Sequence, residues 1–345
     1  MSVYTFNPLQ DPRWAEFVGR HELATVFHSA PWLEAIRRTY GYNFVVYTTS
    51  PPSSPLTNGI VLCRVHSWLT GRRMVSVPFS DHCDPLLDGL DAATEIAEEL
   101  RKQLSSEKLD YIELRPRNEL SVISGIQKTP PFYLHVVDLK PSSQELFRNL
   151  HKDCVQRKIR RAERESLVYE SGNSELLLNA FYRLMIHTRR RHQLPPQPIQ
   201  WFRNLVDCMR DRLQIRVAFK DGKEIASILT LKHKDTIVYK YGCSDAELQN
   251  LGATPLLFWK TIEEAKVEGL QYLDLGRSDT DNPGLIAFKD RLGAKSLMLS
   301  YLRWSKKQQS ESRSQNPNPF VKRLFAIMPD AVLQAAGRIL YRHVA

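Results

Sequence analysis

Side chains that could bind phosphate are concentrated in one stretch of the chain, residues 145–166, with the sequence ELFRNLHKDCVQRKIRRAERES. Within it Arg157 and Arg161 are four positions apart, so they lie on the same face of a helix. Two neighbouring guanidinium groups offer paired N–H donors that match the oxygens of a pyrophosphate or a nucleic-acid backbone. The stretch therefore indicates a site for a phosphate-bearing substrate, unless its basic face is only solvated.

The apolar residues of the same stretch predict one continuous amphipathic helix over 145–166. They recur at spacings of three to five and form a single stripe. The stripe consists of Leu146, Leu150, Val155, Ile159 and Ala162. We expect this stripe to pack on the protein and the basic face to remain at the surface.

Patterns for nucleophilic catalysis or metal binding are weak. His82 and Cys83 are adjacent, so their side chains point apart and a catalytic dyad is not expected. His187 and His192 have no cysteine or acidic partner at metal-ligand spacing, and we expect no metal site. The five cysteines are scattered and form no CxxC, which fits a reducing cytosol. No nucleophile elbow, P-loop or dinucleotide fingerprint is present.

The composition is that of a globular protein. The chain has 345 residues, 42% hydrophobic and 25% charged, which predicts about two domains. No apolar stretch approaches the roughly 18 to 20 residues of a membrane-spanning helix, and the start of the chain lacks a signal pattern. The net charge is +10, and residues 303–345 supply most of it, with eight basic and two acidic residues.

The basic C-terminal part predicts a linker followed by an amphipathic tail. Residues 306–318 are polar and bounded by proline, as in a flexible linker. Apolar residues then recur on one helical face, with Val332, Leu333 and Leu340 among them. Such a tail either packs back on its own protein or lies in a membrane interface.

The two halves of the chain share one order of elements, which predicts an α/β protein with mixed sheets. In the first half we expect helices near 31–40 and 92–105, with strands near 44–47, 60–65, 111–114 and 133–139. In the second half, strands at 213–219, 225–232 and 236–241 precede a helix at 254–268, a strand at 272–275, a helix at 285–292 and a strand at 296–304. Asp221-Gly222 between the first two of these strands predicts a hairpin. The expected domains are 1–140, 141–305 and a tail at 306–345.

The order of elements from 213 to 304 is that of a GNAT acyltransferase core. Four segments, LHKDCVQRKIRRAERESLVYESG, YKYGCSD, YLDLGRS and GLIAFKDRLGAK, together resemble the Fem-type (FemAB-like or BioF2-like) branch of the GNAT superfamily. The resemblance covers roughly residues 25–305. It implies two GNAT-like lobes in tandem joined by a basic helix, with residues 239–244 and 274–278 at the acyl-donor site.

The resemblance assigns the leading catalytic role to Lys289. Phe288-Lys289 matches the family's Phe-Lys, in which the lysine lies beside the reacting carbonyl and the phenylalanine lines the substrate site. Attack of an amine on an ester or thioester builds a negative oxygen, which a fixed cation stabilises more in the transition state than in the substrate. Without the resemblance, Lys289 would be a surface lysine on a short helix. Which group removes the proton of the amine stays open.

The resemblance also predicts substrate contacts. Tyr241 in YGCS is similar to a family tyrosine and would position the acyl group, with Tyr239 nearby. Arg157 and Arg161 resemble family arginines near acceptor phosphates or the tRNA backbone. Trp32 resembles a residue of the family's first lobe, although hydrophobic packing is the default role of such a side chain.

The acyl donor stays open between aminoacyl-tRNA and acyl-CoA, and no tightly bound cofactor is expected. Acetyl-CoA enzymes bind the pyrophosphate with bare amides at a helix N-terminus. The corresponding stretch here, residues 249–254, ends in threonine and is followed by Pro255, which has no amide N–H. The long coiled-coil arm of some Fem-type enzymes is also missing.

These observations predict a cytosolic N-acyltransferase at the inner face of the membrane. Its acceptor would be an amine of a phosphate-bearing cell-envelope precursor, from peptidoglycan or exopolysaccharide. One rival is a non-catalytic GNAT-like binding module of a polysaccharide machine. A general RNA-binding protein is the second rival, although no aromatic RNA-reading motif is present. We expect no DNA partner.

Overall fold

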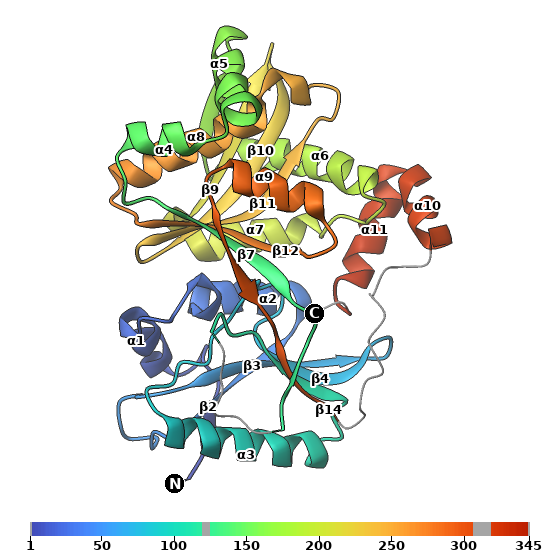
Figure 1. Ribbon diagram of the computed structural model, residues 1–345. Helices are drawn as coiled ribbons and strands as arrows, with labels where there is room; N and C mark the ends of the chain where they lie inside the picture. Colours follow the sequence, from blue (N-terminus) through green and yellow to red (C-terminus); the bar gives the residue numbers. More distant parts are fainter. Residues whose placement is uncertain (1, 119–124, 306–318, 344–345) are drawn as a thin grey trace. The chain divides into compact units, whose positions relative to one another are not determined.

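The computed structural model describes residues 2–118, 125–305 and 319–343, and the chain divides into two compact units (Figure 1). Unit 1 comprises residues 1–131, 299–315 and 339–345, and unit 2 comprises residues 132–298 and 316–338. Each unit is built on one mixed β-sheet with helices on it. None of the described helices is long and apolar enough to cross a membrane.

The sheet of unit 1 has the strand order β1-β2-β3-β4-β5-β14-β6. Its strands are β1 (Tyr4–Phe6), β2 (Asn43–Thr48), β3 (Ile60–Ser67), β4 (Gly71–Val75), β5 (Tyr111–Leu114), β6 (Gln127–Lys128) and β14 (Leu302–Ser305). All neighbours are antiparallel except β4 and β5, which run parallel. We did not predict β1 or β4, and β4 is half polar in sequence, so its period-2 signal is weak.

Three helices cover the faces of the unit 1 sheet (Figure 1). They are α1 (Pro12–Arg20), α2 (Ala30–Tyr40) and α3 (Leu90–Ser106). Ile96 and Leu100 of α3 pack with Ile112 and Trp304 in a buried cluster on one face. The start of α1 is fixed by Asp11, whose side chain accepts a hydrogen bond from the N–H of Arg13 at 3.0 Å.

The sheet of unit 2 has the order β13-β7-β12-β11-β10-β9-β8. Its strands are β7 (Phe132–Asp138), β8 (Val168–Gly172), β9 (Leu213–Lys220), β10 (Lys223–His233), β11 (Thr236–Ser244), β12 (Tyr272–Asp279) and β13 (Lys295–Leu299). The pair β11 and β12 is parallel, as β4 and β5 are in unit 1. In unit 2 the pairs β7–β12, β10–β11, β9–β10 and β8–β9 are antiparallel, so one parallel pair among antiparallel ones occurs in both units, as expected for two GNAT-like lobes in tandem.

The predicted hairpin of unit 2 is confirmed. Asp221 and Gly222 join β9 to β10 and both have positive φ angles, of 51° and 78°. Two residues with φ above zero give the turn a twist that matches the paired strands, which is why Asp-Gly is favoured there.

Helices cover both faces of the unit 2 sheet. They are α4 (Ser143–Asn149), α5 (Arg157–Arg164), α6 (Glu175–Arg191), α7 (Ile199–Met209), α8 (Ala253–Val267) and α9 (Pro283–Arg291). The helices α4 and α5 pack on α8, whereas α6 packs on β10 and β11, and α7 packs on α6 and β9 (Figure 1). Asn282 caps α9 by accepting a hydrogen bond from the N–H of Leu285, and Pro283 follows at the first helical position.

The continuous helix predicted over 145–166 is wrong. The stretch consists of α4, a π-helical segment (Lys152–Gln156) and α5, and Leu150 ends α4 in an extended conformation. The apolar stripe is nevertheless buried as expected, and Leu146, Leu150 and Ile159 belong to the core of unit 2. The break allows both short helices to pack on α8.

The domain boundaries also differ from those expected at 140/141 and 305/306. Strand β7 precedes the rest of unit 2 in sequence but pairs with β12. The strand predicted at 296–304 is divided into β13 in unit 2 and β14, which pairs with β5 in unit 1. Each sheet thus receives one strand from a distant part of the chain, and local sequence patterns carry no record of such pairings.

The tail forms two helices, α10 (Pro319–Ile327) and α11 (Asp330–Leu340), while the linker at 306–318 lies outside the described residues. Phe325 and Leu333 are buried. The guanidinium of Arg190 on α6 donates to the carbonyl of Met328 and to Asp330. Residues 319–338 of the tail therefore pack back on unit 2, one of the two arrangements we expected.

Candidate active site

The two parallel strands of unit 2 stop pairing halfway along their length. Only Thr236–Val238 of β11 and Tyr272–Asp274 of β12 are in register. The remaining residues of both strands, up to Ser244 and Asp279, form no pairs with each other. Main-chain N–H and C=O groups at such a separation are available to a ligand. The separation lies at residues 239–244 and 274–278, the stretches expected at the acyl-donor site.

A bulge in β12 lies beside this separation. Between Asp274 and Arg277 the register with β7 shifts, so that two residues of β12 lie opposite the single residue His135. Gly276 has a φ of 70°, and its N–H donates to the carboxylate of Asp274 at 2.7 Å. A bulge of this kind turns carbonyl groups out of the ladder and leaves them to other partners.

The side chain of Lys289 on α9 donates hydrogen bonds to these carbonyl groups. Its side chain is only 2% exposed, and Nζ donates to the carbonyl oxygens of Gly276 at 2.9 Å and Arg277 at 2.8 Å. The structure therefore contradicts a surface lysine and places the ammonium group at the bulge. A buried ammonium group at this position can act through its positive charge on an anion that develops beside it.

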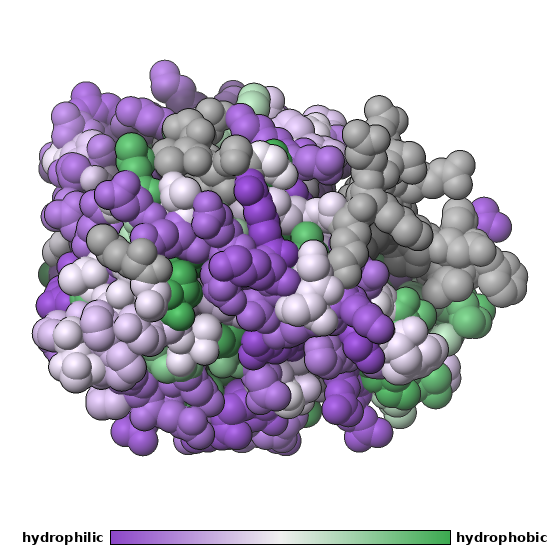
Figure 2. Space-filling view, turned by 90° about the horizontal axis from the view of Figure 1, so that it is seen from below, coloured by the Kyte–Doolittle hydropathy of each residue, from purple (hydrophilic) through white to green (hydrophobic). Residues whose placement is uncertain are grey.

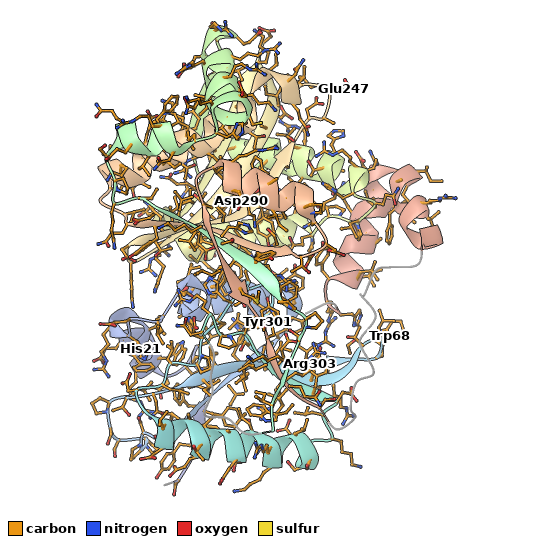
Figure 3. All side chains as sticks on the ribbon, in the orientation of Figure 1. His21, Trp68, Glu247, Asp290, Tyr301 and Arg303 are labelled. Atoms are coloured by element: carbon orange, nitrogen blue, oxygen red, sulfur yellow. The ribbon has the colours of Figure 1, made fainter. Side chains whose placement is uncertain are left out.

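His135 of β7 is a neighbour of Lys289 that the sequence analysis missed. The imidazole is fully buried, and Nε2 lies 3.6 Å from Oδ1 of Asp290, which Figure 3 labels on α9. Burial, together with the charge of Lys289, lowers the pKa of His135 below its usual value. Both effects favour the neutral imidazole of His135 over its charged form. His135 lies within the apolar run YLHVV, whose pattern is that of an ordinary strand.

Tyr239 and Phe288 come together through a third ring. The ring of Tyr239 lies 4.9 Å from that of Phe258 on α8, which in turn lies 5.6 Å from that of Phe288. Gly242 leaves room for Tyr239, because a Cβ at that position would lie 2.1 Å from the tyrosine hydroxyl. The two predicted substrate contacts thus share one aromatic row on the α8 face of the sheet.

Tyr241 lies on the opposite face. The register with β10 shifts between Tyr239 and Tyr241, which places Lys240 in a bulge and sends the two tyrosines to different sides. The hydroxyl of Tyr241 accepts a hydrogen bond from Nε1 of Trp201 at 2.9 Å, and its ring packs on Phe202. The structure does not bring Tyr241 to Lys289, and the acyl-positioning role of Tyr241 stays a prediction.

Trp32 lies in unit 1, on α2. It is fully buried, and its ring packs edge-on against Phe27 at 5.2 Å. This is the hydrophobic packing expected by default, and the substrate contact of Trp32 stays a prediction.

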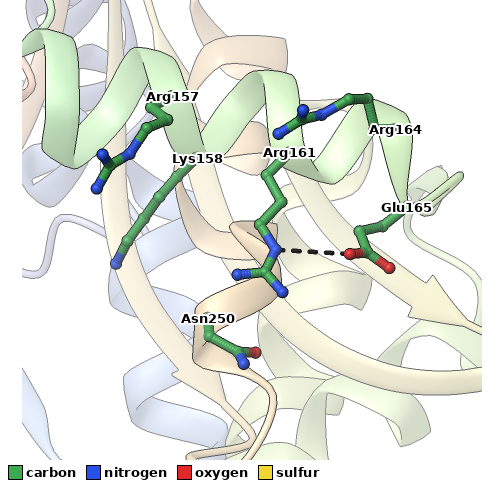
Figure 4. Close-up of a pocket in the computed structure, with 6 residues that line it drawn as sticks. All are labelled: Arg157, Lys158, Arg161, Arg164, Glu165 and Asn250. Atoms are coloured by element: carbon green, nitrogen blue, oxygen red, sulfur yellow. Dashed lines mark ion pairs between the residues drawn. The ribbon is translucent and has the colours of Figure 1, made fainter.

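The predicted phosphate-binding arginines line a basic hollow on unit 2 with a volume of about 600 Å³ (Figure 4). Its lining residues are Arg157, Lys158, Arg161, Arg164, Glu165 and Asn250. Arg161 extends from α5 toward Asn250 and pairs with Glu165 at 3.5 Å. Within the described part of the chain, neither Lys158 nor Arg164 has an ion-pair partner. Four cations with one carboxylate favour a polyanionic ligand.

The start of α8 is closed by α5. Gly252 has a φ of 83° and caps α8, and a Cβ there would lie 2.1 Å from the carbonyl oxygen of Lys158. Gly252 and Ala253 are both buried. The helix terminus that holds the pyrophosphate in acetyl-CoA enzymes is thus covered here by the basic helix.

A metal centre has no support in the part of the chain that the structure describes. No group of three or more histidine, cysteine, aspartate or glutamate side chains is placed to hold an ion there.

Comparisons with known structures define the class of protein. The fold is similar to that of FemX, with a TM-score of 0.70 and 13% identity over 87% of this chain and 97% of FemX. It is also similar to the C-terminal domain of a putative lysylphosphatidylglycerol synthetase from Agrobacterium fabrum, with a TM-score of 0.56 and 14% identity over 86% of this chain and 90% of that one. A tandem GNAT protein from the clavulanic acid biosynthesis pathway has a TM-score of 0.55, at 10% identity over 89% and 99% of the two chains. The chain is a tandem GNAT-fold protein.

Sequence comparisons bear on the branch of the GNAT superfamily that the chain resembles. Residues 149–290 match the family model described as the acetyltransferase (GNAT) domain. A UDP-N-acetylmuramoylpentapeptide-lysine N(6)-alanyltransferase of Weissella viridescens is 29% identical over 97 residues, which are 28% of this chain and 29% of that enzyme. The match thus spans less than a third of the relative's length. Together with the fold, these matches support the Fem-type branch of the GNAT superfamily for this chain.

Proposed function

We propose that the protein transfers an aminoacyl group from aminoacyl-tRNA to an amine of a peptidoglycan precursor. The observation that carries the proposal is the ammonium group of Lys289, held at the β12 bulge where β11 and β12 stop pairing. The alanyltransferase relative supports the acceptor class, because its name gives the lysine of a muramoylpentapeptide as the acceptor of the alanyl group.

The proposed chemistry is direct transfer. The acceptor amine attacks the ester carbonyl of the aminoacyl-tRNA, so that a C–N bond forms and a tetrahedral oxyanion develops. Lys289 stabilises the oxyanion, which then collapses and breaks the bond to the ribose oxygen. The amine loses a proton and the ribose oxygen gains one. The row of Tyr239, Phe258 and Phe288 would line the acyl group.

The choice of aminoacyl-tRNA over acyl-CoA rests on the basic hollow and on the closed start of α8. The carbonyl group of Lys158 lies where a CoA pyrophosphate would meet the amides of α8. By contrast, the helix α5 presents four cations to an RNA backbone, those of Arg157, Lys158, Arg161 and Arg164. Binding of tRNA would then weaken steeply with salt.

We also propose a peripheral position on the inner face of the cell membrane. The tail helices bury Phe325 and Leu333 but expose Leu324, Ile327 and Val332. Figure 2 shows hydrophobic side chains at the surface on the side of the molecule where Figure 1 draws α10 and α11. An exposed apolar face beside basic residues is typical of helices at a lipid interface.

The test compares envelope precursors by mass spectrometry in wild-type, deletion, Lys289→Ala and Lys266→Ala strains. Lys266 is a matched control, because its ammonium also donates to two main-chain carbonyls, those of Leu139 and Lys140. The proposal is supported if one aminoacylated species is lost in the deletion strain and in the Lys289→Ala strain but is kept in the wild type and in the Lys266→Ala strain. If that species is a polysaccharide instead of a peptidoglycan precursor, the acceptor is wrong. If Lys289→Ala leaves the profile unchanged, the non-catalytic binding module becomes the better account.

A further inference from the structure

A tryptophan is exposed at the end of the β3–β4 hairpin of unit 1. We use the name hairpin tip for residues 67–72. Trp68 is 83% exposed and Leu69 is 51% exposed, and Figure 3 shows Trp68 at the margin of unit 1. The other five tryptophans of the chain are all buried, and they are Trp14, Trp32, Trp201, Trp259 and Trp304. Exposure of one tryptophan beside a leucine costs hydrophobic free energy that burial would recover.

The hairpin tip is held rigidly. The hydroxyl of Ser67 accepts hydrogen bonds from the N–H groups of Leu69 at 3.1 Å and Thr70 at 3.0 Å. The guanidinium of Arg73, which is buried, donates to the carbonyl and to the hydroxyl of Thr70. Trp68 is therefore exposed on a turn that is held by hydrogen bonds.

His343, which follows α11, is bound to the same turn. Thr70 donates to the carbonyl of His343 at 2.7 Å, and Arg73 donates to the same oxygen at 3.0 Å. The imidazole of His343 lies 3.0 Å from the hydroxyl of Ser67, and its ring is 5.5 Å from that of Trp68. Two segments far apart in sequence thus form one surface.

This surface combines apolar and basic side chains. Ile339, one helical turn before His343, is 59% exposed, and Arg72 and Arg342 are exposed as well. A carboxylate next to the hairpin tip, that of Asp110, accepts a hydrogen bond from the N–H of Arg72 at 2.9 Å. Tryptophan and leucine flanked by arginines suit the boundary between anionic headgroups and acyl chains.

We propose that the hairpin tip and residues 339–343 form a contact surface for anionic phospholipid, with Trp68 and Leu69 entering the interface. Charge complementarity argues for lipid, because the arginines favour an anionic headgroup layer and the two apolar side chains favour the layer beneath it. The inference rests on the proposed membrane-side function and names the residues of unit 1 that meet the lipid.

The experiment measures tryptophan fluorescence of the full chain with vesicles of phosphatidylglycerol and phosphatidylcholine, with and without bromine on the acyl chains. Because Trp68 alone among the six tryptophans is exposed, we expect a blue shift and quenching by the brominated lipid in the wild type. Both signals should vanish in Trp68→Phe. They should also be much weaker with vesicles of phosphatidylcholine alone.

Co-sedimentation with the same vesicles gives the second readout. We expect Leu69→Glu to weaken binding about tenfold, since a charge replaces an inserted apolar group. Leu176→Glu is the matched control, because it places the same charge on an exposed leucine of α6 in unit 2, where Leu176 is 83% exposed. Thermal unfolding confirms that both variants are folded.

Three outcomes would overturn the inference: no vesicle binding, binding without quenching of Trp68, or a blue shift that appears on concentration without lipid, which would point to a second copy of the chain. Two variants distinguish failure of this inference from failure of the proposed function. Lys289→Ala should bind vesicles like the wild type, and Leu69→Glu should keep full activity on a precursor that is free of lipid.

Discussion

Nζ of Lys289 lies 2.9 Å from the carbonyl oxygen of Gly276, a residue 13 positions earlier in the chain. The contact joins α9 to the one place in β12 where the ladder with β7 is interrupted. A lysine that only stabilised the bulge would be needed for folding, whereas one that meets an oxyanion would also be needed for chemistry.

Replacement of Lys289 by alanine is expected to lower kcat about 100- to 1000-fold, the usual effect of removing one oxyanion-stabilising group. KM should change little, since the charge interacts with the transition state more than with the substrate. Steady-state kinetics with purified protein checks this. Lys266→Ala, which removes an equivalent pair of hydrogen bonds to main-chain carbonyls, should retain wild-type kcat.

Replacement of Gly252 by alanine should destabilise the protein by about 2 kcal/mol or more, because the new Cβ meets the carbonyl of Lys158 and the φ of 83° disfavours a side chain. Urea unfolding measures the decrease in stability. Gly269→Ala is the control, since Gly269 has a similar φ of 76° and open space around it. Equal decreases in both variants would show that the contact between α5 and α8 contributes nothing.

Removal of the cations in the basic hollow should weaken tRNA binding and make it less sensitive to salt. For Lys158→Ala and Arg164→Ala we expect the slope of log K against log salt to fall by about 1 for each phosphate that the protein no longer neutralises. Filter binding over a range of salt concentrations provides the slope. Arg203→Ala, which removes an exposed arginine paired with Glu175, should leave it unchanged.

Stability should decrease in mild acid because of His28. Burial lowers the pKa of this histidine to about 4, whereas the unfolded chain has a value near 6.5. Between these pH values the unfolded state binds more protons than the folded state. The contribution of the neutral His28 to the free energy of unfolding is therefore complete above pH 6.5 and is lost as the pH falls toward 4. The full decrease is on the order of 3 kcal/mol, and urea unfolding at pH 7 and pH 5 should detect part of it. The dependence should be smaller in His28→Gln; an identical dependence would exclude His28 as its source.

Local sequence patterns predict much of unit 2 but little of the pairing between distant strands. Asp221-Gly222 specifies its hairpin because only a turn with two positive φ angles joins the strands there. By contrast, nothing in residues 132–138 indicates that β7 pairs with β12, and nothing near 302 indicates pairing with β5. These pairings decide the boundaries of the units, so the expected boundaries were displaced.

The candidate site likewise combines residues that the sequence predicts with residues that it does not. Lys289 and the basic face of α5 were predicted, because a motif and a charge pattern mark them. His135 was not, since one histidine in an apolar strand gives no signal until the β12 bulge lies opposite it. The separation of Tyr239 from Tyr241 depends on a bulge at Lys240, which sequence periodicity does not reveal.

The most direct test is transfer of a labelled amino acid from aminoacyl-tRNA to UDP-N-acetylmuramoylpentapeptide by the purified wild type, Lys289→Ala and Lys266→Ala. Our account predicts labelled product with the wild type and Lys266→Ala, and a reaction slower by about 100-fold or more with Lys289→Ala. Equal rates for all three proteins would contradict the role of Lys289. Transfer from acyl-CoA but not from aminoacyl-tRNA would contradict the proposed donor.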